Sequence, residues 1–191
     1  ATGEIKKLST SQTGSSSGYF NGLGIGAGGS PIYAFRSTDG NSWPNAQLLE
    51  WDSTAGGWMT LTGQALASGP DPSLGSSGVR ASDTYAGAGT NLVAGAVDLR
   101  SGRYMFGGFS EATGATGRVI DTFHLWAYDS SLPTANKIRY LGWIDVDSTK
   151  TSINGDMAFD AAGNLFVVWG TGDYTTAIFT ITASTIENAV T

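Results

Sequence analysis

The sequence predicts an all-β protein made of propeller-type repeats, each a four-stranded antiparallel meander, with about three blades in all. Charged residues make up only 14% of the 191-residue chain, which holds 28 glycines and 6 tryptophans. Few charges and many glycines are typical of all-β proteins with tight turns. No long segment carries apolar residues at the i, i+3, i+4 and i+7 spacing of an amphipathic helix. Only residues 183–189 predict a short helix, with Ser184 or Thr185 as its N-cap.

The most informative observation is a unit that occurs three times: an apolar run, a turn that contains glycine, and a second apolar run. Its copies lie at residues 21–35, 92–107 and 154–168. In the two later copies an aspartate, Asp98 or Asp160, precedes a short hairpin whose glycine can adopt positive φ. The unit therefore predicts a β-hairpin in each repeat.

A second pair of apolar strands follows this unit in the first two repeats, so that two hairpins make a four-stranded meander. The repeats cover approximately residues 20–63, 91–143 and 154–191 of a single domain, residues 1–191. The third repeat stops after its third strand, and its fourth strand is either absent or supplied by residues 3–8.

Two polar inserts, residues 62–91 and 110–122, lengthen the repeats. We expect them to form loops on one face, where ligand contacts usually lie. A closed propeller normally has about four to eight blades. Three blades therefore predict a fragment of a longer propeller, a part that self-associates, or an open β-array.

Three segments resemble a known family. They are NGLGIGAGGSPIYAF at residues 21–35, LVAGAVD with YMFGGF at residues 92–98 and 104–109, and NGDMAFD at residues 154–160. In this order they resemble the N-terminal propeller-like region of large actinobacterial (Gram-positive) cell-wall-anchored surface proteins. In that family, prealbumin-like or pilin-type repeats commonly follow this region. The resemblance implies surface display and a role in adhesion or matrix building, and it supplies no catalytic residues.

Composition excludes several classes of function. The net charge is −6, and the 10 lysines and arginines are scattered, so no basic stripe is present for nucleic acid. No apolar run reaches the ~20 residues of a membrane span. The chain has no cysteine, which excludes disulfides and thiolate chemistry. Few lysines, much Gly, Ser and Thr, and small residues after Ala1 favour an exported, extracellular or cell-surface protein.

Oxygen ligands near the end of the second repeat make Ca²⁺ a candidate cofactor. Asp145 and Asp147 lie on one face of an extended segment, and Asn154 and Asp156 follow shortly after. The spacing is not that of an EF-hand, and the favoured interpretation is that these aspartates cap turns. Four aspartates at strand-to-turn junctions are likewise predicted to form turns: Asp52, Asp98, Asp129 and Asp160.

Aromatic residues are the strongest candidates for ligand binding. Trp43, in a polar loop, is predicted either to bind a ligand by stacking or to fold onto a blade edge. The other five tryptophans are expected to pack in the core. His124, the single histidine, shares a strand face with Trp126 and Tyr128, which favours packing over catalysis.

These observations predict a non-catalytic extracellular adhesion or interaction domain of a bacterial surface protein. Its partner would be a protein, a glycan or a copy of itself. Two alternatives stay open at this point. One is a structural subunit of an extracellular fibre or matrix, and the other is a propeller-based lyase or glycan hydrolase.

Overall fold

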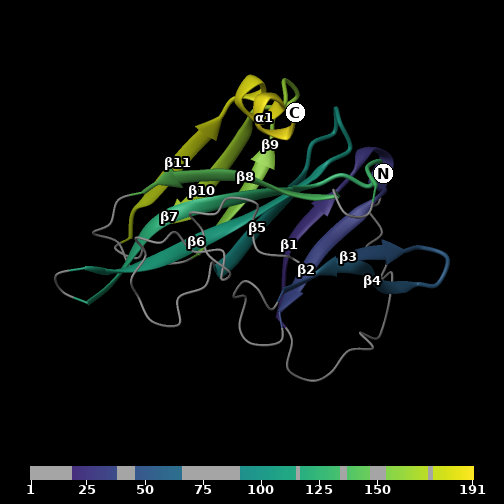
Figure 1. Ribbon diagram of the computed structural model, residues 1–191, viewed down its shortest axis with the longest axis horizontal. Helices are drawn as coiled ribbons and strands as arrows, with labels where there is room; N and C mark the ends of the chain where they lie inside the picture. Colours follow the sequence, from purple (N-terminus) through teal and green to yellow (C-terminus); the bar gives the residue numbers. More distant parts are fainter. Residues whose placement is uncertain are drawn as a thin grey trace, which may run out of the picture.

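Three antiparallel β-sheets follow one another along the chain, and a short helix ends it (Figure 1). The computed structural model describes residues 19–37, 46–65, 91–114, 117–133, 137–146, 154–171 and 174–191. The first sheet has the strand order β1-β2-β3-β4, the central sheet β5-β6-β7-β8, and the third sheet β11-β10-β9. The predicted all-β class with repeated antiparallel meanders is therefore confirmed. None of the described sheets closes on itself, and the strands form no complete ring of blades.

The strand bounds follow the predicted repeats. In the first sheet they are β1 (Tyr19–Ile25), β2 (Ile32–Ser37), β3 (Ala46–Asp52) and β4 (Gly57–Ala65). In the central sheet they are β5 (Asn91–Val97), β6 (Tyr104–Gly114), β7 (Gly117–Tyr128) and β8 (Ile138–Asp145). In the third sheet they are β9 (Asn154–Phe159), β10 (Leu165–Gly170) and β11 (Thr176–Ile181). A 3-10 turn, η1 (Ala27–Gly29), joins β1 to β2, and helix α1 (Ala183–Val190) follows β11.

Aspartates form the hairpin turns, as the sequence predicts. In each turn a carboxylate oxygen accepts a hydrogen bond from a backbone N–H two to four residues further on, which is the geometry of an Asx-type turn. The pairs are Asp52 with Thr54 at 2.7 Å, Asp98 with Arg100 at 3.0 Å, Asp129 with Ser131 at 2.9 Å, and Asp160 with Asn164 at 2.8 Å. The glycines of two of these turns, Gly102 and Gly163, have φ of 74° and 84°, which explains why glycine is required there.

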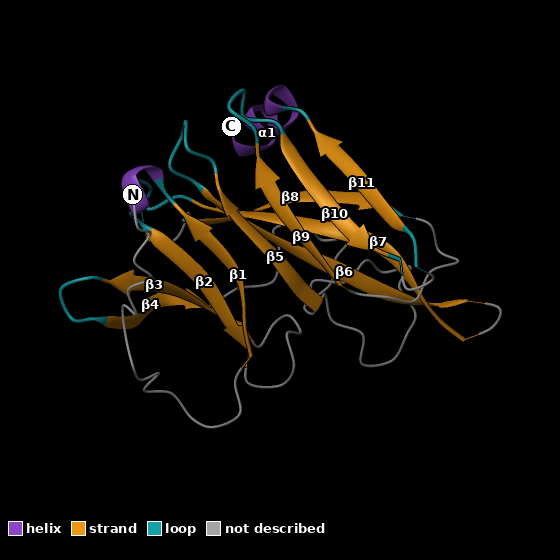
Figure 2. Ribbon diagram, turned by 180° about the vertical axis from the view of Figure 1, so that it is seen from behind, coloured by secondary structure: helices purple, strands orange, loops and turns teal. Residues whose placement is uncertain are grey.

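The sheets stack face to face through their first strands. β1 packs beside β5, and β5 packs beside β9, so that the first strand of each meander lies at the centre of the array (Figure 2). The core consists of large side chains between the sheets, including Phe35, Tyr104, Phe109 and Trp169, all fully or almost fully buried. Consecutive meanders thus bury their apolar faces against each other.

Helix α1 ends the described chain at the outer strands of the central sheet. The Thr182 hydroxyl accepts a hydrogen bond from the Thr185 N–H at 3.3 Å, so Thr182 is the N-cap. The predicted helix is confirmed, but the predicted caps, Ser184 and Thr185, are wrong by two to three positions. Ile186 is buried and lines the contact with β7 and β8. No helix in the described parts of the chain is long and apolar enough to cross a membrane.

Some expectations fail. The insert at residues 110–122 does not form the predicted loop. Instead, β6 and β7 continue through most of it as a long hairpin, with Ser110 paired to Thr122 and Thr113 paired to Arg118. Backbone pairing with the neighbouring strand stabilises this segment in spite of its polar sequence. The other insert, residues 62–91, lies mostly outside the described residues, although β4 extends into it as far as Ala65. Residues 3–8 also lie outside them.

Candidate interaction faces

His124 is the centre of a buried polar cluster in the central sheet. Its Nε2 lies 3.0 Å from the Ser110 hydroxyl and 3.1 Å from the Thr122 hydroxyl, and its Nδ1 lies 3.0 Å from the Tyr140 hydroxyl. Ser110, Thr122 and His124 have no exposed surface. The cluster joins β6, β7 and β8 by satisfying polar groups that would otherwise be buried without partners. The imidazole itself has no surface exposed to solvent.

His124 lies beside aromatic rings, including that of Trp126, with which the sequence predicts that it shares a strand face. The imidazole lies 5.9 Å from the Trp126 ring and 6.0 Å from the Tyr140 ring. Core packing is confirmed for Trp126 and Trp169, each 1% exposed, and is wrong for Trp143, which is 37% exposed in β8. Trp143 belongs to an outer strand, where the sheet face is only partly covered.

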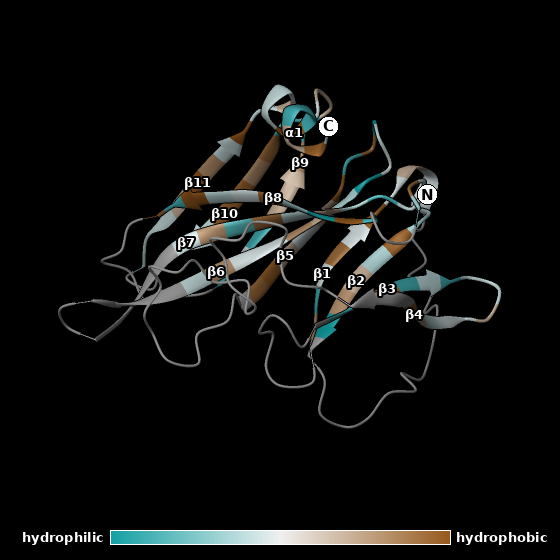
Figure 3. Ribbon diagram, in the orientation of Figure 1, coloured by the Kyte–Doolittle hydropathy of each residue, from teal (hydrophilic) through white to brown (hydrophobic). Residues whose placement is uncertain are grey.

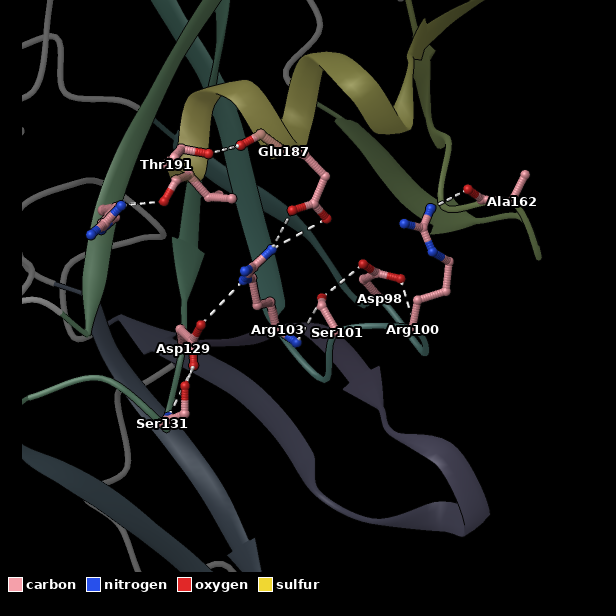
Figure 4. Close-up of polar contacts among 11 residues, drawn as sticks. Asp98, Arg100, Ser101, Arg103, Asp129, Ser131, Ala162, Glu187 and Thr191 are labelled. Atoms are coloured by element: carbon pink, nitrogen blue, oxygen red, sulfur yellow. Dashed lines mark hydrogen bonds and ion pairs between the residues drawn. The ribbon is translucent and has the colours of Figure 1, made fainter.

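An ion cluster fastens α1 to the turns of the central sheet (Figure 4). Arg103 donates from Nε to Asp129 at 3.1 Å and from a guanidinium NH₂ nitrogen to Glu187 at 3.1 Å. Burial works against ionisation of Asp129, but hydrogen bonds from Ser131 and from Arg103 outweigh it and lower the pKa of this carboxyl. The Arg139 guanidinium donates to the Val190 carbonyl at the end of the same helix. All these groups have partners within the protein, which indicates a structural role.

The structure describes only part of the predicted calcium site. Asp145 is exposed at the end of β8, while Asn154 and Asp156 lie on β9 of the third sheet. Asp147 lies outside the described residues, and so does Trp43. Among the residues that the structure describes, no three His, Cys, Asp or Glu side chains gather in a group that could hold a metal ion. Calcium binding at Asp145 and Asp147 stays a prediction, as does ligand stacking on Trp43.

The third sheet has one covered face and one open face. Along β10 the side chains alternate strictly: Leu165, Val167 and Trp169 are buried against the central sheet, whereas Phe166 and Val168 are 37% and 39% exposed. We call the side turned away from the central sheet the open face of the third sheet. Its members are Asn154, Asp156, Ala158, Phe166, Val168, Thr176, Ile178 and Thr180, all of them exposed.

The first sheet exposes apolar residues along β1 on the side turned away from the central sheet, which we call the open face of the first sheet. Ala34 of β2 and Leu49 of β3, on the same side, are only 3% and 1% exposed. On β1, Gly22 and Gly24 face the central sheet, while Leu23 and Ile25 point the other way and are 59% and 49% exposed. Further out on the same side, an aromatic cluster contains Phe20, Trp51 and Trp58, and the Arg36 guanidinium lies 6.0 Å from the Phe20 ring.

The central sheet differs from the first and third sheets in how its faces are covered. Every residue of β6 from Tyr104 to Ser110 and of β7 from Thr122 to Tyr128 is buried, on both faces. Figure 3 shows the hydrophobic residues concentrated in strands such as β5 and β10. A sheet covered on both sides needs no alternation of polar residues, and β6 and β7 expose no apolar side chain along these stretches.

Sequence reasoning missed these open faces, although one signal was present. The β10 sequence LFVVWG has no polar residue between its apolar ones, which is typical of a strand buried on both faces. A strand of this kind with one face exposed indicates a surface that another element is expected to cover.

No protein-family model matches the chain, and no curated protein matches it. What the fold and the two open faces define is a class: an all-β repeat protein whose first and third sheets each expose apolar side chains on the side turned away from the central sheet.

Proposed function

We propose that this chain is a non-catalytic interaction domain of a bacterial surface protein, in which the three sheets are blades of a propeller-type array. The observation that carries the proposal is the open face of the third sheet. There, Phe166, Val168 and Ile178, the last 64% exposed, project from one regular β-surface. Contiguous exposed apolar side chains on a soluble domain mark a place where a partner binds.

The propeller interpretation is supported by the position of the first strands. In a propeller each blade is a four-stranded antiparallel meander whose first strand lies nearest the axis, and blades pack face to face. The first and central sheets are such meanders, and β1, β5 and β9 lie side by side. The third sheet has three described strands, with α1 following in the chain where a fourth strand would come.

Extracellular display and adhesion are supported mainly by the sequence. The low charge content, the absence of cysteine and the resemblance to wall-anchored surface proteins favour them. The apolar face fits a protein or glycoprotein partner, because aliphatic and aromatic side chains supply the central part of most binding surfaces.

A structural subunit of an extracellular fibre or matrix is the second candidate, and one observation favours it. Among the described strands, β11 forms the outer edge of the third sheet, with no strand beyond it. An unpaired edge offers backbone N–H and C=O groups to a strand from another molecule.

The test of the interaction function is binding to two immobilised surfaces by surface plasmon resonance: mucin, which presents both protein and glycan, and the chain itself. We expect binding to at least one surface, and loss of that binding in Val168→Glu. The matched control is Leu99→Glu, because Leu99 is 61% exposed in a turn and lies outside both open faces. An absence of binding to both surfaces, or equal binding by Val168→Glu and the parent, would overturn the proposal.

A further inference from the structure

The three meanders can be compared position by position, because equivalent hydrogen bonds close their first hairpins. The backbone N–H of Asp98 bonds to the carbonyl of Arg103, that of Asp160 to Asn164, and that of Gly26 to Pro31. The residues that follow are therefore equivalent: Ile32 in β2, Tyr104 in β6 and Leu165 in β10. Counting along β2, β6 and β10 from these three residues shows which positions are equivalent and on which face of its sheet each position lies.

At equivalent positions facing the next sheet, burial depends on whether a next sheet exists. Tyr33 and Phe35 of the first sheet are 2% and 0% exposed, because the central sheet covers them. Met105 of the central sheet is 0% exposed. The corresponding residues of the third sheet, Phe166 and Val168, are 37% and 39% exposed. The third sheet thus carries the apolar side chains of a junction that has no partner among the described residues.

On the first strand of each sheet, the positions that face the preceding sheet show the same contrast at the other end. On the second strand they do not, because Ala34, at the position of Phe106 and Val167, is 3% exposed. Val97 of β5 is 6% exposed and contacts the first sheet, where a Cβ on Gly24 would lie 3.1 Å from it. Met157 of β9 is 6% exposed against the central sheet. On β1, Ile25 corresponds to Val97 and Leu23 to Met157, and these two are 49% and 59% exposed.

We propose that the open face of the third sheet binds the open face of the first sheet of a second copy of this chain, head to tail. At each internal junction, one sheet packs through the face that is turned toward the next sheet along the chain, which we call its onward face. The next sheet packs through the face that is turned back toward it, its backward face, and the first strands lie side by side. The two open faces are an onward face and a backward face, so they match each other and not themselves. Two copies of three sheets would close through two identical junctions into a ring of six, within the usual range of about four to eight blades.

The charges on the two faces agree with this arrangement. The open face of the third sheet carries one carboxylate, Asp156, and the described open face of the first sheet carries one guanidinium, Arg36. A junction of two like faces would instead place two carboxylates or two guanidinium groups in the same interface, which is unfavourable. The charges therefore favour head-to-tail pairing over pairing of a face with itself.

The internal junctions also indicate which residues meet. Gly24 of β1 contacts Val97 of β5, and the equivalents of these two are Ala158 in β9 and Ile25 in β1. In that junction a small residue stands opposite a branched one at the strand nearest the axis. In the proposed pair, Ala158 of one copy contacts Ile25 of the other.

The first experiment is the solution mass of the chain across a range of protein concentrations by analytical ultracentrifugation. We expect a dimer. Val168→Glu and Ile25→Glu each place a charge in a junction that excludes water, and each should weaken dimerisation at least about tenfold. Leu99→Glu adds the same charge outside the faces and should remain a dimer. A parent chain that stays monomeric at all concentrations, or variants that dimerise like the parent, would overturn the proposal.

A second experiment tests the head-to-tail direction. Since the chain has no cysteine, Ala158→Cys and Ile25→Cys variants each carry one thiol. After subunit exchange and mild oxidation, we expect a disulfide-linked pair in the mixture of the two variants and none in either variant alone. Leu99→Cys controls for collisional cross-linking. Cross-linking of Ala158→Cys with itself, or none in the mixture, would overturn the direction.

This inference rests on the proposed interaction function, and the two can fail separately. A monomer that binds mucin through the third-sheet face would overturn self-association and leave the interaction function standing. A chain that neither binds mucin nor associates with itself would overturn both.

Discussion

The hydroxyl of Tyr104, in the central sheet, donates a hydrogen bond to the backbone carbonyl of Gly22, in the first sheet. Tyr104 is fully buried, and burial, followed by the nearby charge of Asp156, raises the pKa of its phenol well above 10.0. The hydroxyl therefore remains a donor throughout the physiological pH range. The bond joins two sheets at the strands nearest the centre of the array.

Tyr104→Phe removes this donor and leaves the Gly22 carbonyl in a buried position without it. We expect the free energy of unfolding to fall by about 1–2 kcal/mol. Chemical denaturation of the variant and the parent measures the difference. Tyr174→Phe, at a fully exposed tyrosine, is the control and should leave stability unchanged; equal stability of Tyr104→Phe and the parent would contradict the prediction.

Gly95→Ala tests how closely the first and central sheets approach. A Cβ at Gly95 would lie 2.2 Å from the Gly22 carbonyl oxygen, a backbone atom that cannot move aside cheaply. We expect a loss of about 2–3 kcal/mol, the cost of overpacking a core, measured by urea denaturation. Gly57→Ala meets no atom within 4 Å and should cost little. Similar stabilities of the two variants would show that the sheets separate easily.

His124→Leu removes the common partner of Ser110, Thr122 and Tyr140 while nearly preserving volume. Their hydroxyls lose bonds in a site without water access, so we expect a loss of about 2–3 kcal/mol. Thermal unfolding followed by tryptophan fluorescence measures it, because Trp126 lies 5.9 Å from the imidazole. An unchanged melting temperature would mean that the three hydroxyls satisfy one another.

Asp129→Asn tests the ion cluster through pH. The folded-state pKa of Asp129 lies below its ordinary value of 3.8, so its stabilising contribution is present above that value and is lost as pH falls through the folded pKa. We therefore expect Asp129→Asn to be less stable than the parent at neutral pH and to approach it below about pH 4. Asp145→Asn removes the same charge from an exposed site; it is the control, and its stability should depend on pH as that of the parent does. Parallel stability curves for Asp129→Asn and the parent would refute the assignment.

Ile186→Ala tests the docking of α1. Ile186 is 3% exposed and borders a cavity of about 100 Å³ between α1 and strands β7 and β8. Truncation enlarges that cavity, and we expect a loss of about 2–4 kcal/mol. Hydrogen exchange of α1 amides should accelerate more than that of β6. Ser184→Ala, at an exposed position of the same helix, is the control; equal exchange in both variants would indicate that α1 does not depend on this contact.

Several features were predictable from local chemistry. The hairpins at Asp98 and Asp160 follow from an aspartate that bonds to nearby N–H groups and a glycine that adopts positive φ, and neither needs distant contacts. The helix at the end was predictable for the same reason, although its cap lies at Thr182. The hairpin through residues 110–122 was not predictable, because its polar sequence gives little strand signal and the pairing of β6 with β7 maintains it.

By itself, the sequence determined the all-β class, the three repeats and the turns, because these depend on periodicity and on hydrogen bonds between close neighbours. Only the tertiary structure decided which faces are covered. Met105 and Phe166 occupy equivalent positions with similar hydrophobicity, yet one is fully buried and the other is 37% exposed. Burial depends on whether another sheet lies against the residue, and that neighbour comes from a distant part of the chain or, as proposed here, from a second copy.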